Sequence, residues 1–157
     1  MYEFNILEGE NRPLFFFTTD NGYTYNVSFN PHVYKIEGIT DISQVDVICL
    51  DNENPKKDIK VGKTICAIIE HFLSQNKERI VGYICDTQDK REESRNRKFY
   101  NWYRIHNNGG YTLKNYEIRP NQTNEVYYTA VIYHPEAYLD QFIDDTYGRE
   151  MKELEDK

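Results

Sequence analysis

A length of 157 residues, with 39% hydrophobic and 15% aromatic residues, predicts a single globular domain over residues 1–157 with a core of its own. The formal net charge of -7 argues against a general nucleic-acid binder, because neutralising phosphates requires a basic surface. No apolar run approaches the length of a membrane span. The N-terminal "MYEFNILEGE" also lacks the basic and apolar regions of a signal peptide. We therefore expect a cytoplasmic protein without a membrane segment.

The N-terminal half carries strand signals. In "LFFFTTDNGYTYNVSF", two apolar and aromatic runs flank Asn21-Gly22, the preferred pair for a tight hairpin turn. The second run alternates, which indicates a strand with one buried face. Weaker strand candidates are "YEFNIL" before the hairpin and "HVYKIEG" after it. "QVDVICL" is predicted as a strand near the centre of the sheet, with Val45, Val47 and Cys49 on one face.

The second half alternates helices and strands. A helix is predicted from about Lys60, because apolar residues recur through "VGKTICAIIEHFL" at spacings of three and four. "RIVGYIC" predicts a strand, the segment after it a helix that ends at "NNGG", and "YTLKNYEIRP" and "EVYYTAVIYHP" two further strands. The chain closes with a predicted helix, "EAYLDQFIDDTYGREMKELEDK", amphipathic through Tyr138, Leu139, Phe142 and Ile143 and fraying from Gly148.

This element order predicts an α+β fold with a mostly antiparallel sheet. One strand–helix–strand unit at its centre would supply a parallel pair, and the hairpin would lie N-terminal to it. The three cysteines, Cys49, Cys66 and Cys85, all lie in apolar runs, so we expect reduced thiols packed in the core. The four histidines show no metal-ligand spacing, and no metal site is predicted.

The start of the first helix is a candidate anion site. "VGKT" resembles the end of a phosphate-binding loop, but Lys57 stands where the full motif has glycine, which argues against a nucleotide triphosphatase. A helix that begins near Gly62 still presents N–H groups and a positive dipole end to an anion. The predicted anion- or cofactor-binding set is Lys57, Lys60, Gly62, Lys63 and Thr64. The alternative is a solvated, lysine-rich loop.

Residues 85–103, "CDTQDKREESRNRKFYNWY", mix acidic, basic and aromatic side chains. On a helical wheel Phe99, Trp102 and Tyr103 share one face with Arg95, and Arg91 lies at its edge. Arg91 and Arg95 could therefore clamp an anion beneath an aromatic wall, or Arg95 could pair internally with a carboxylate. Two carboxylates are available at the strand end, Asp86 and Asp89, where capping of the helix is favoured over cation binding. The predicted partner- or ligand-contact set is Asp86, Asp89, Arg91, Arg95, Trp102 and Tyr103.

Two resemblances bear on this chain. From "QVDVICL" to about residue 133, the element order resembles the core of GNAT-type N-acetyltransferases, although strands stand where that family usually has two substrate-binding helices. The family's cofactor motif, Q/R-x-x-G-x-G/A, corresponds to residues 57–62, "KDIKVG", where only Gly62 matches outright. The resemblance implies acetyl-CoA as cofactor and a tyrosine general acid, for which Phe99, Tyr100 and Tyr103 compete. The pattern C-D-x-x-D-x-R-x-x-x-R-x-x-x-F-x-x-W-Y also resembles an uncharacterised family of small bacterial proteins.

Two functions follow as expectations. The first is a non-catalytic interaction protein of antitoxin, immunity or anti-defence type, which binds a protein partner and needs no cofactor. Its basis is the negative charge, the 14 tyrosines and the incomplete catalytic motifs. The second is an acyl-CoA-dependent N-acetyltransferase with a degenerate pyrophosphate loop. We favour the first, and the oligomeric state stays open.

Overall fold

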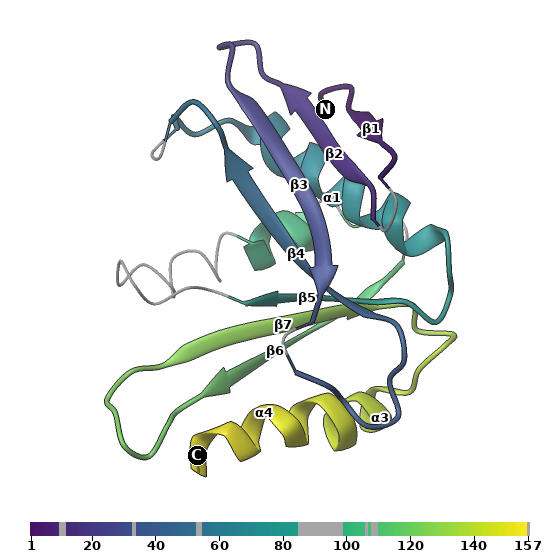
Figure 1. The fold of residues 1–157 in the computed structure, drawn as a ribbon, viewed down its shortest axis with the longest axis vertical. Coiled ribbons are helices and arrows are strands. Elements are labelled where there is room, and N and C mark those ends of the chain that lie inside the picture. Colours follow the sequence, from purple (N-terminus) through teal and green to yellow (C-terminus); the bar gives the residue numbers. More distant parts are fainter. Residues whose placement is uncertain are drawn as a thin grey trace.

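The computed structural model describes residues 1–9, 12–32, 34–52, 55–84, 99–105, 107 and 110–156. Within these residues a seven-stranded sheet has the order β1-β2-β3-β4-β5-β7-β6 (Figure 1). The strands are β1 (Asn5–Leu7), β2 (Leu14–Thr18), β3 (Thr24–Pro31), β4 (Ile42–Cys49), β5 (Ile80–Ile84), β6 (Thr112–Ile118) and β7 (Tyr127–Tyr133). All neighbouring strands are antiparallel except β4 and β5, so the predicted α+β class and mostly antiparallel sheet are confirmed.

The predicted hairpin is β2–β3. Gly22 adopts a φ of 81°, a conformation that glycine reaches without steric cost, and its N–H donates to the carbonyl of Thr19 at 2.9 Å. The expected strand "HVYKIEG" is wrong: its described residues are not in a strand. Instead, the chain turns at Gly38, which has a φ of 87°. Ile36 and Ile39, on either side of this turn, are buried in the same hydrophobic cluster as the C-terminal helix.

Between β4 and β5 lies the helix α1 (Ile59–Ser74), as the apolar spacing predicted. Its buried side packs against the alternating residues of β2, β3 and β4, which include Phe15, Phe29 and Val45. We call this side of the sheet the α1 face. A shorter helix over residues 99–105 adds Phe99 and Trp102 to the same core.

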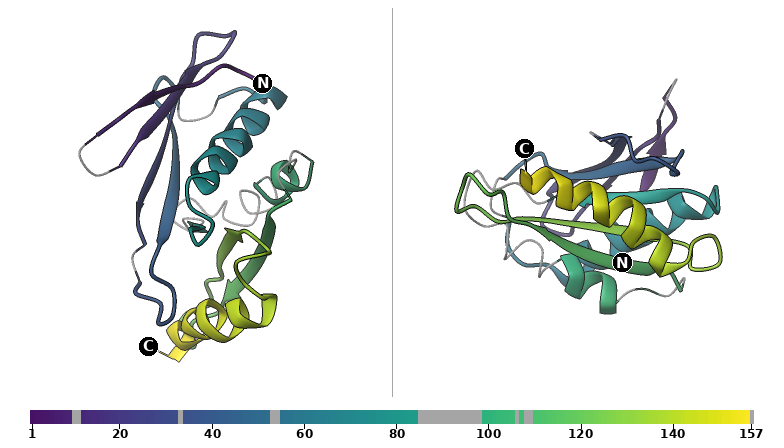
Figure 2. Two further views of the ribbon diagram at one scale, coloured as in Figure 1. Left: turned by 90° about the vertical axis from the view of Figure 1, so that its right-hand side faces the viewer. Right: turned by 90° about the horizontal axis from the view of Figure 1, so that it is seen from below.

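The C-terminal segment covers the opposite side of β5, β6 and β7, which we call the C-terminal face (Figure 2). It comprises α3 (Asp140–Ile143), a π-helical turn (Asp144–Gly148), α4 (Arg149–Glu153) and a 3₁₀ turn (Leu154–Asp156). The expected fraying from Gly148 is wrong, because Met151 is 2% exposed and the helical run continues beyond it.

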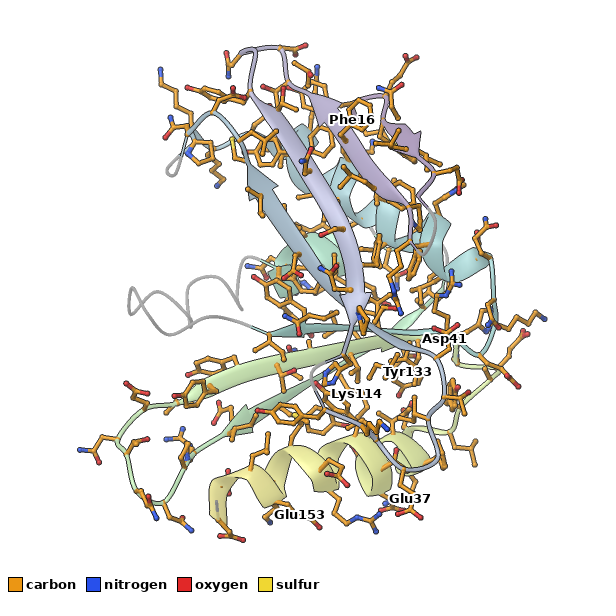
Figure 3. All side chains as sticks on the ribbon, viewed as in Figure 1. Phe16, Glu37, Asp41, Lys114, Tyr133 and Glu153 are labelled. Carbon is orange, nitrogen blue, oxygen red and sulfur yellow. The ribbon has the colours of Figure 1, made fainter. Side chains whose placement is uncertain are left out.

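The predicted apolar stripe of that helix is also partly wrong. Leu139 is 77% exposed, whereas Ile143, Tyr147 and Met151 face the sheet. Tyr133 and Lys114 project from the sheet toward this helix (Figure 3). In the described part of the chain, no helix is long and apolar enough to cross a membrane.

Candidate functional site

The parallel strands β4 and β5 form a wedge. They pair at three positions, Ile42–Ile80, Ser43–Val81 and Gln44–Gly82, and then separate (Figure 1). Beyond Gly82, β5 continues alongside β7, whereas β4 from Val45 onward has no strand on its β5 side among the described residues. An edge of this kind carries backbone N–H and C=O groups that can pair with an extended ligand.

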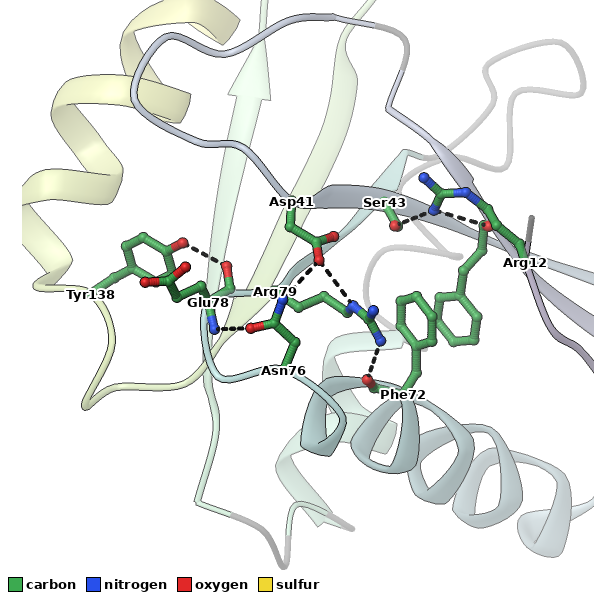
Figure 4. A network of polar contacts seen from close by, with 9 residues as sticks. Arg12, Asp41, Ser43, Phe72, Asn76, Glu78, Arg79 and Tyr138 are labelled. Carbon is green, nitrogen blue, oxygen red and sulfur yellow. Dashed lines mark hydrogen bonds and ion pairs between the residues drawn. The ribbon is translucent and has the colours of Figure 1, made fainter. Parts of the chain in front are cut away.

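The paired end of the wedge is clamped by a polar network (Figure 4). Asp41, directly before β4, accepts from Arg79, directly before β5, at 3.4 Å and from Asn76 at 3.1 Å. The Arg79 guanidinium also donates to the carbonyl of Phe72 at 2.8 Å and lies 4.1 Å from the centre of its ring. These contacts hold the start of both strands to the end of α1, so the wedge has a fixed apex.

On the α1 face the wedge contains a cavity of about 450 Å³. Its walls are mostly apolar and aromatic, and come from β3, β4, α1, β5, the helix over residues 99–105 and the loop before α1: Tyr25, Val47, Ile48, Cys49, Asn52, Pro55, Val61, Ile65, Tyr83, Phe99 and Trp102. The ring of Phe99 stacks on Tyr83 with 4.2 Å between centroids. We call this space the wedge cavity.

Gly62 and Trp102, which were predicted in separate sites, are in contact. A Cβ atom at position 62 would lie 2.6 Å from the Trp102 indole, so the glycine permits the indole to pack directly on α1. The predicted common face of Phe99, Trp102 and Tyr103 is confirmed, since all three pack against the core of the α1 face.

The polar side chains that line the wedge cavity include the Tyr25 hydroxyl and the Cys49 thiol. Burial, with the Cys49 thiol beside it, raises the pKa of Tyr25 to about 12, so this hydroxyl stays protonated at neutral pH. Cys49 is a half-buried free thiol on the cavity wall. Cys66 is buried, and burial raises the pKa of its thiol to about 12, in keeping with the predicted core role.

The candidate anion site is largely engaged in contacts within the chain. The Asp58 carboxylate caps α1 by accepting from the Lys60 N–H at 2.9 Å, and it also accepts from the Tyr2 hydroxyl at 2.5 Å. The Lys60 ammonium pairs with Asp20 at 3.0 Å, which raises the lysine pKa. Thr64 is buried and accepts from the Tyr2 N–H at 2.8 Å. Of the predicted set, Lys57 and Lys63 are exposed cations near this helix end.

The three positions proposed for a general acid lie on the short helix over residues 99–105 but have different surroundings. Phe99 lines the wedge cavity but has no titratable group. The Tyr103 hydroxyl donates to the carbonyl of Tyr111 and accepts from Asn107 at 2.7 Å, and burial raises its pKa. Tyr100 is exposed. The other predicted contact residues, Asp86, Asp89, Arg91 and Arg95, lie outside the described residues.

A second cavity, of about 620 Å³, lies on the C-terminal face of the sheet. Gln44, at the apex of the wedge, forms part of its wall. Nearby, the His32 ring packs over Gly82, 3.2 Å from where a Cβ atom would stand, and burial lowers the pKa of His32. Sequence reasoning missed both features. A glycine inside a strand was the available signal, since it often marks a close approach.

Among the described residues, no group of three or more His, Cys, Asp or Glu side chains could hold a metal ion. The wedge cavity offers the backbone amides of a strand edge, the Cys49 thiol and the Asn52 side-chain amide, and the cavity on the opposite face offers the Gln44 side-chain amide.

Comparison with known proteins gives two matches. In a search of solved structures, the chain resembles the acetyltransferase of the GNAT family from Streptococcus pneumoniae at 9% identity and a TM-score of 0.45, covering 81% of this chain and 70% of that one. No curated protein matches the sequence. A family described only as of unknown function matches residues 57–147, more than half of the chain, so the protein belongs to the family DUF6169.

Proposed function

We propose that the protein is an acyl-CoA-dependent N-acyltransferase whose wedge cavity holds the pantetheine arm of the acyl donor. The observation that carries this proposal is the separation of β4 from β5 beside an aromatic cavity of about 450 Å³. A pantetheine arm is a slender chain with two amides. It can therefore pair with the strand edge of β4 as an added strand would, while its methylene groups contact the apolar walls.

In this arrangement the thioester would point toward the apex near Gln44. The nitrogen of an acceptor amine attacks the thioester carbonyl carbon, so that a C–N bond forms and the C–S bond breaks. The proton lost by the amine leaves with the thiol product. Backbone N–H groups on the inner edge of β4 are the groups available to stabilise the developing oxyanion.

The phosphate end of CoA would bind less well than the arm. Because the Asp58 carboxylate caps α1, it occupies the helix end that would otherwise receive a pyrophosphate. The exposed ammonium groups of Lys57 and Lys63 remain for this role. We therefore expect most of the affinity to come from the pantetheine arm, and little from 3′,5′-adenosine bisphosphate alone.

The capping of α1 by Asp58 also favours a second candidate function, that of a non-catalytic interaction protein. With Asp58 on the helix end and Asp20 on Lys60, two of the groups proposed for cofactor binding contact the chain itself. Three large apolar side chains are exposed near the end of β4 and the start of α1: Ile48, Leu50 and Ile59. A protein partner of the antitoxin or immunity type would use such a surface.

Calorimetric titration with acetyl-CoA separates the two candidates. The acyltransferase proposal expects binding, its loss in Val47→Phe, which fills the wedge cavity, and its retention in Leu50→Phe, an exposed position that does not line it. Circular dichroism confirms that both variants fold. Absence of binding to the wild-type protein would reject the acyltransferase and leave the interaction protein as the proposal.

A further inference from the structure

The cavity on the C-terminal face has the walls of a site for an apolar molecule. Its described lining residues carry no charge, and they come from the sheet, the adjoining loops and the C-terminal helix: Tyr34, Gln44, Ile84, Ile118, Pro120, Tyr127, Thr129, Met151 and Leu154. A volume of about 620 Å³ falls in the range of small-molecule sites. A charged ligand would lose its hydration there without gaining a counter-charge from these walls.

One polar group of this wall lacks a hydrogen bond. The Gln44 Oε1 atom is buried and, among the described residues, has no donor. The hydroxyl of Thr129, by contrast, already donates to the Tyr83 carbonyl at 3.0 Å and contacts the Tyr147 hydroxyl at 2.6 Å. A buried carbonyl without a donor is unfavourable, and because the Gln44 side chain forms part of the cavity wall, a ligand N–H that donates to its carbonyl oxygen would remove this cost.

We infer that this cavity binds a small neutral aromatic amine, with its nitrogen at Gln44. An aromatic amine suits the site because it is uncharged at neutral pH, offers N–H donors and carries an apolar ring. An alkylamine would enter as an ammonium ion, which these walls do not compensate. Gln44 belongs to the last pair of β4 with β5, so the nitrogen lies at the wedge apex. The assignment of this amine as acyl acceptor rests on the proposed function.

The site is tested first without any acyl donor. Titration of 4-methylaniline into protein with labelled methyl groups should shift the signals of Ile84, Ile118 and Met151. The N,N-dimethyl analogue keeps the shape but has no N–H, and we expect it to bind about tenfold more weakly. Benzylamine, a cation at neutral pH, should bind weakly too. Equal affinity for 4-methylaniline and its dimethyl analogue would overturn the role of Gln44.

Gln44→Leu supplies the variant, because it keeps the side chain's size and removes the carbonyl. It should fold at least as stably as the wild type and bind both aromatic ligands equally, whereas Gln75→Leu, outside the cavity, should leave the preference unchanged. Mass spectrometry after incubation with acetyl-CoA then checks transfer to 4-methylaniline. Amine binding without acetyl-CoA binding would reject the proposed function and support the cavity assignment. Acetyl-CoA binding without amine binding would reject the assignment alone.

Discussion

The two faces of the sheet are held by different interactions. The α1 face is packed by stacked rings: Phe29 on Phe72 at 3.9 Å, Tyr83 on Phe99 at 4.2 Å and Phe17 on Tyr25 at 5.2 Å. On the C-terminal face, tyrosine hydroxyls bond to neighbouring groups: Tyr133 to Asp140 at 2.6 Å, Tyr116 to Asp144 at 2.7 Å and Tyr147 to Thr129 at 2.6 Å. Stacked ring pairs are thus prominent on the α1 face, whereas on the C-terminal face tyrosine hydroxyl bonds tie the helix to the sheet, beside ring pairs such as Tyr138 with Phe142.

The π-helical turn fits this division. Ile143, Tyr147 and Met151 are buried and lie four residues apart. In a regular α-helix, residues at this spacing drift around the axis, whereas a widened turn keeps them closer to one line. Tyr147, inside the turn, can then reach Thr129 in the middle of β7. The π-helical turn thus keeps the buried side of the C-terminal helix against the sheet, where Met151 and Leu154 line the cavity on the C-terminal face.

The largest contrast between the faces should come from removing a phenylalanine from each. Phe72→Ala takes away the ring between Phe29 and the Arg79 guanidinium, and we expect a loss of about 3–5 kcal/mol in unfolding free energy. Phe142→Ala, on the C-terminal helix, removes a ring that is 36% exposed and should cost about 1 kcal/mol or less. Urea denaturation measures both, and similar losses would contradict the comparison.

Within the α1 face, Gly62→Ala tests the contact with Trp102. Alanine in a helix interior is ordinarily favourable over glycine by about 1 kcal/mol. Here the added methyl group would lie 2.6 Å from the indole, so we expect a net destabilisation of about 1–3 kcal/mol. The sign of the change, measured by urea denaturation, is the informative result.

Repeating Gly62→Ala in a second variant shows whether the indole causes the destabilisation. In a Trp102→Leu protein the indole is gone, so Gly62→Ala should be neutral or stabilising there. If the alanine is equally harmful with and without the indole, its cost comes from the helix and the contact is unimportant.

The sequence predicted the elements better than the contacts between them. The alternation in β3 and the apolar spacing of α1 predicted which side of each element is buried, and the structure confirms both predictions. Neither pattern says which elements meet. Gly62 was therefore assigned to phosphate binding and Trp102 to ligand contact, although the two touch across 40 positions of sequence. The strand predicted for "HVYKIEG" is wrong because Ile36 is buried from a loop, and a short apolar run does not show whether its burial comes from a strand or a loop.

The cavity on the C-terminal face was also beyond prediction. Gln44 reads as one polar residue on the solvent side of a strand, and its unpaired carbonyl becomes visible only when β5, β7 and the C-terminal helix are in place. The helix itself was expected to end near Gly148, since glycine and a charged tail are typical of fraying ends. Burial of Met151 against the sheet overrides that local preference.

On the C-terminal face, Tyr147→Phe tests the directed hydrogen bonds. It removes the hydroxyl beside Thr129 while keeping the ring, and Thr129 retains its bond to the Tyr83 carbonyl. We expect a loss of about 1 kcal/mol, the usual contribution of one buried hydrogen bond. Tyr127→Phe, whose hydroxyl bonds to Glu125 at the surface, should cost less. Thermal melts of the two variants check the order, and a reversed order would refute it.

The smallest effect should be a pH-dependent one at Asp144. Its carboxylate accepts from Lys114 at 2.7 Å and from the Tyr116 hydroxyl, and these contacts hold its pKa below the ordinary value of 3.8. A carboxyl group whose pKa is lower in the folded state stabilises the fold above its unfolded pKa, and this stabilisation is lost as the pH falls through the folded value. The side chain is 42% exposed, so solvent screening limits the contribution to about 1 kcal/mol or less.

Asp144→Asn should therefore be less stable than wild type at pH 6, with the gap closing below about pH 4. Asp145→Asn, which removes a neighbouring carboxylate whose hydrogen bond is to the uncharged, exposed Gln141, is the matched control. Urea denaturation across this pH range checks the expectation, and a gap that stays constant with pH would show that the ion pair does not contribute.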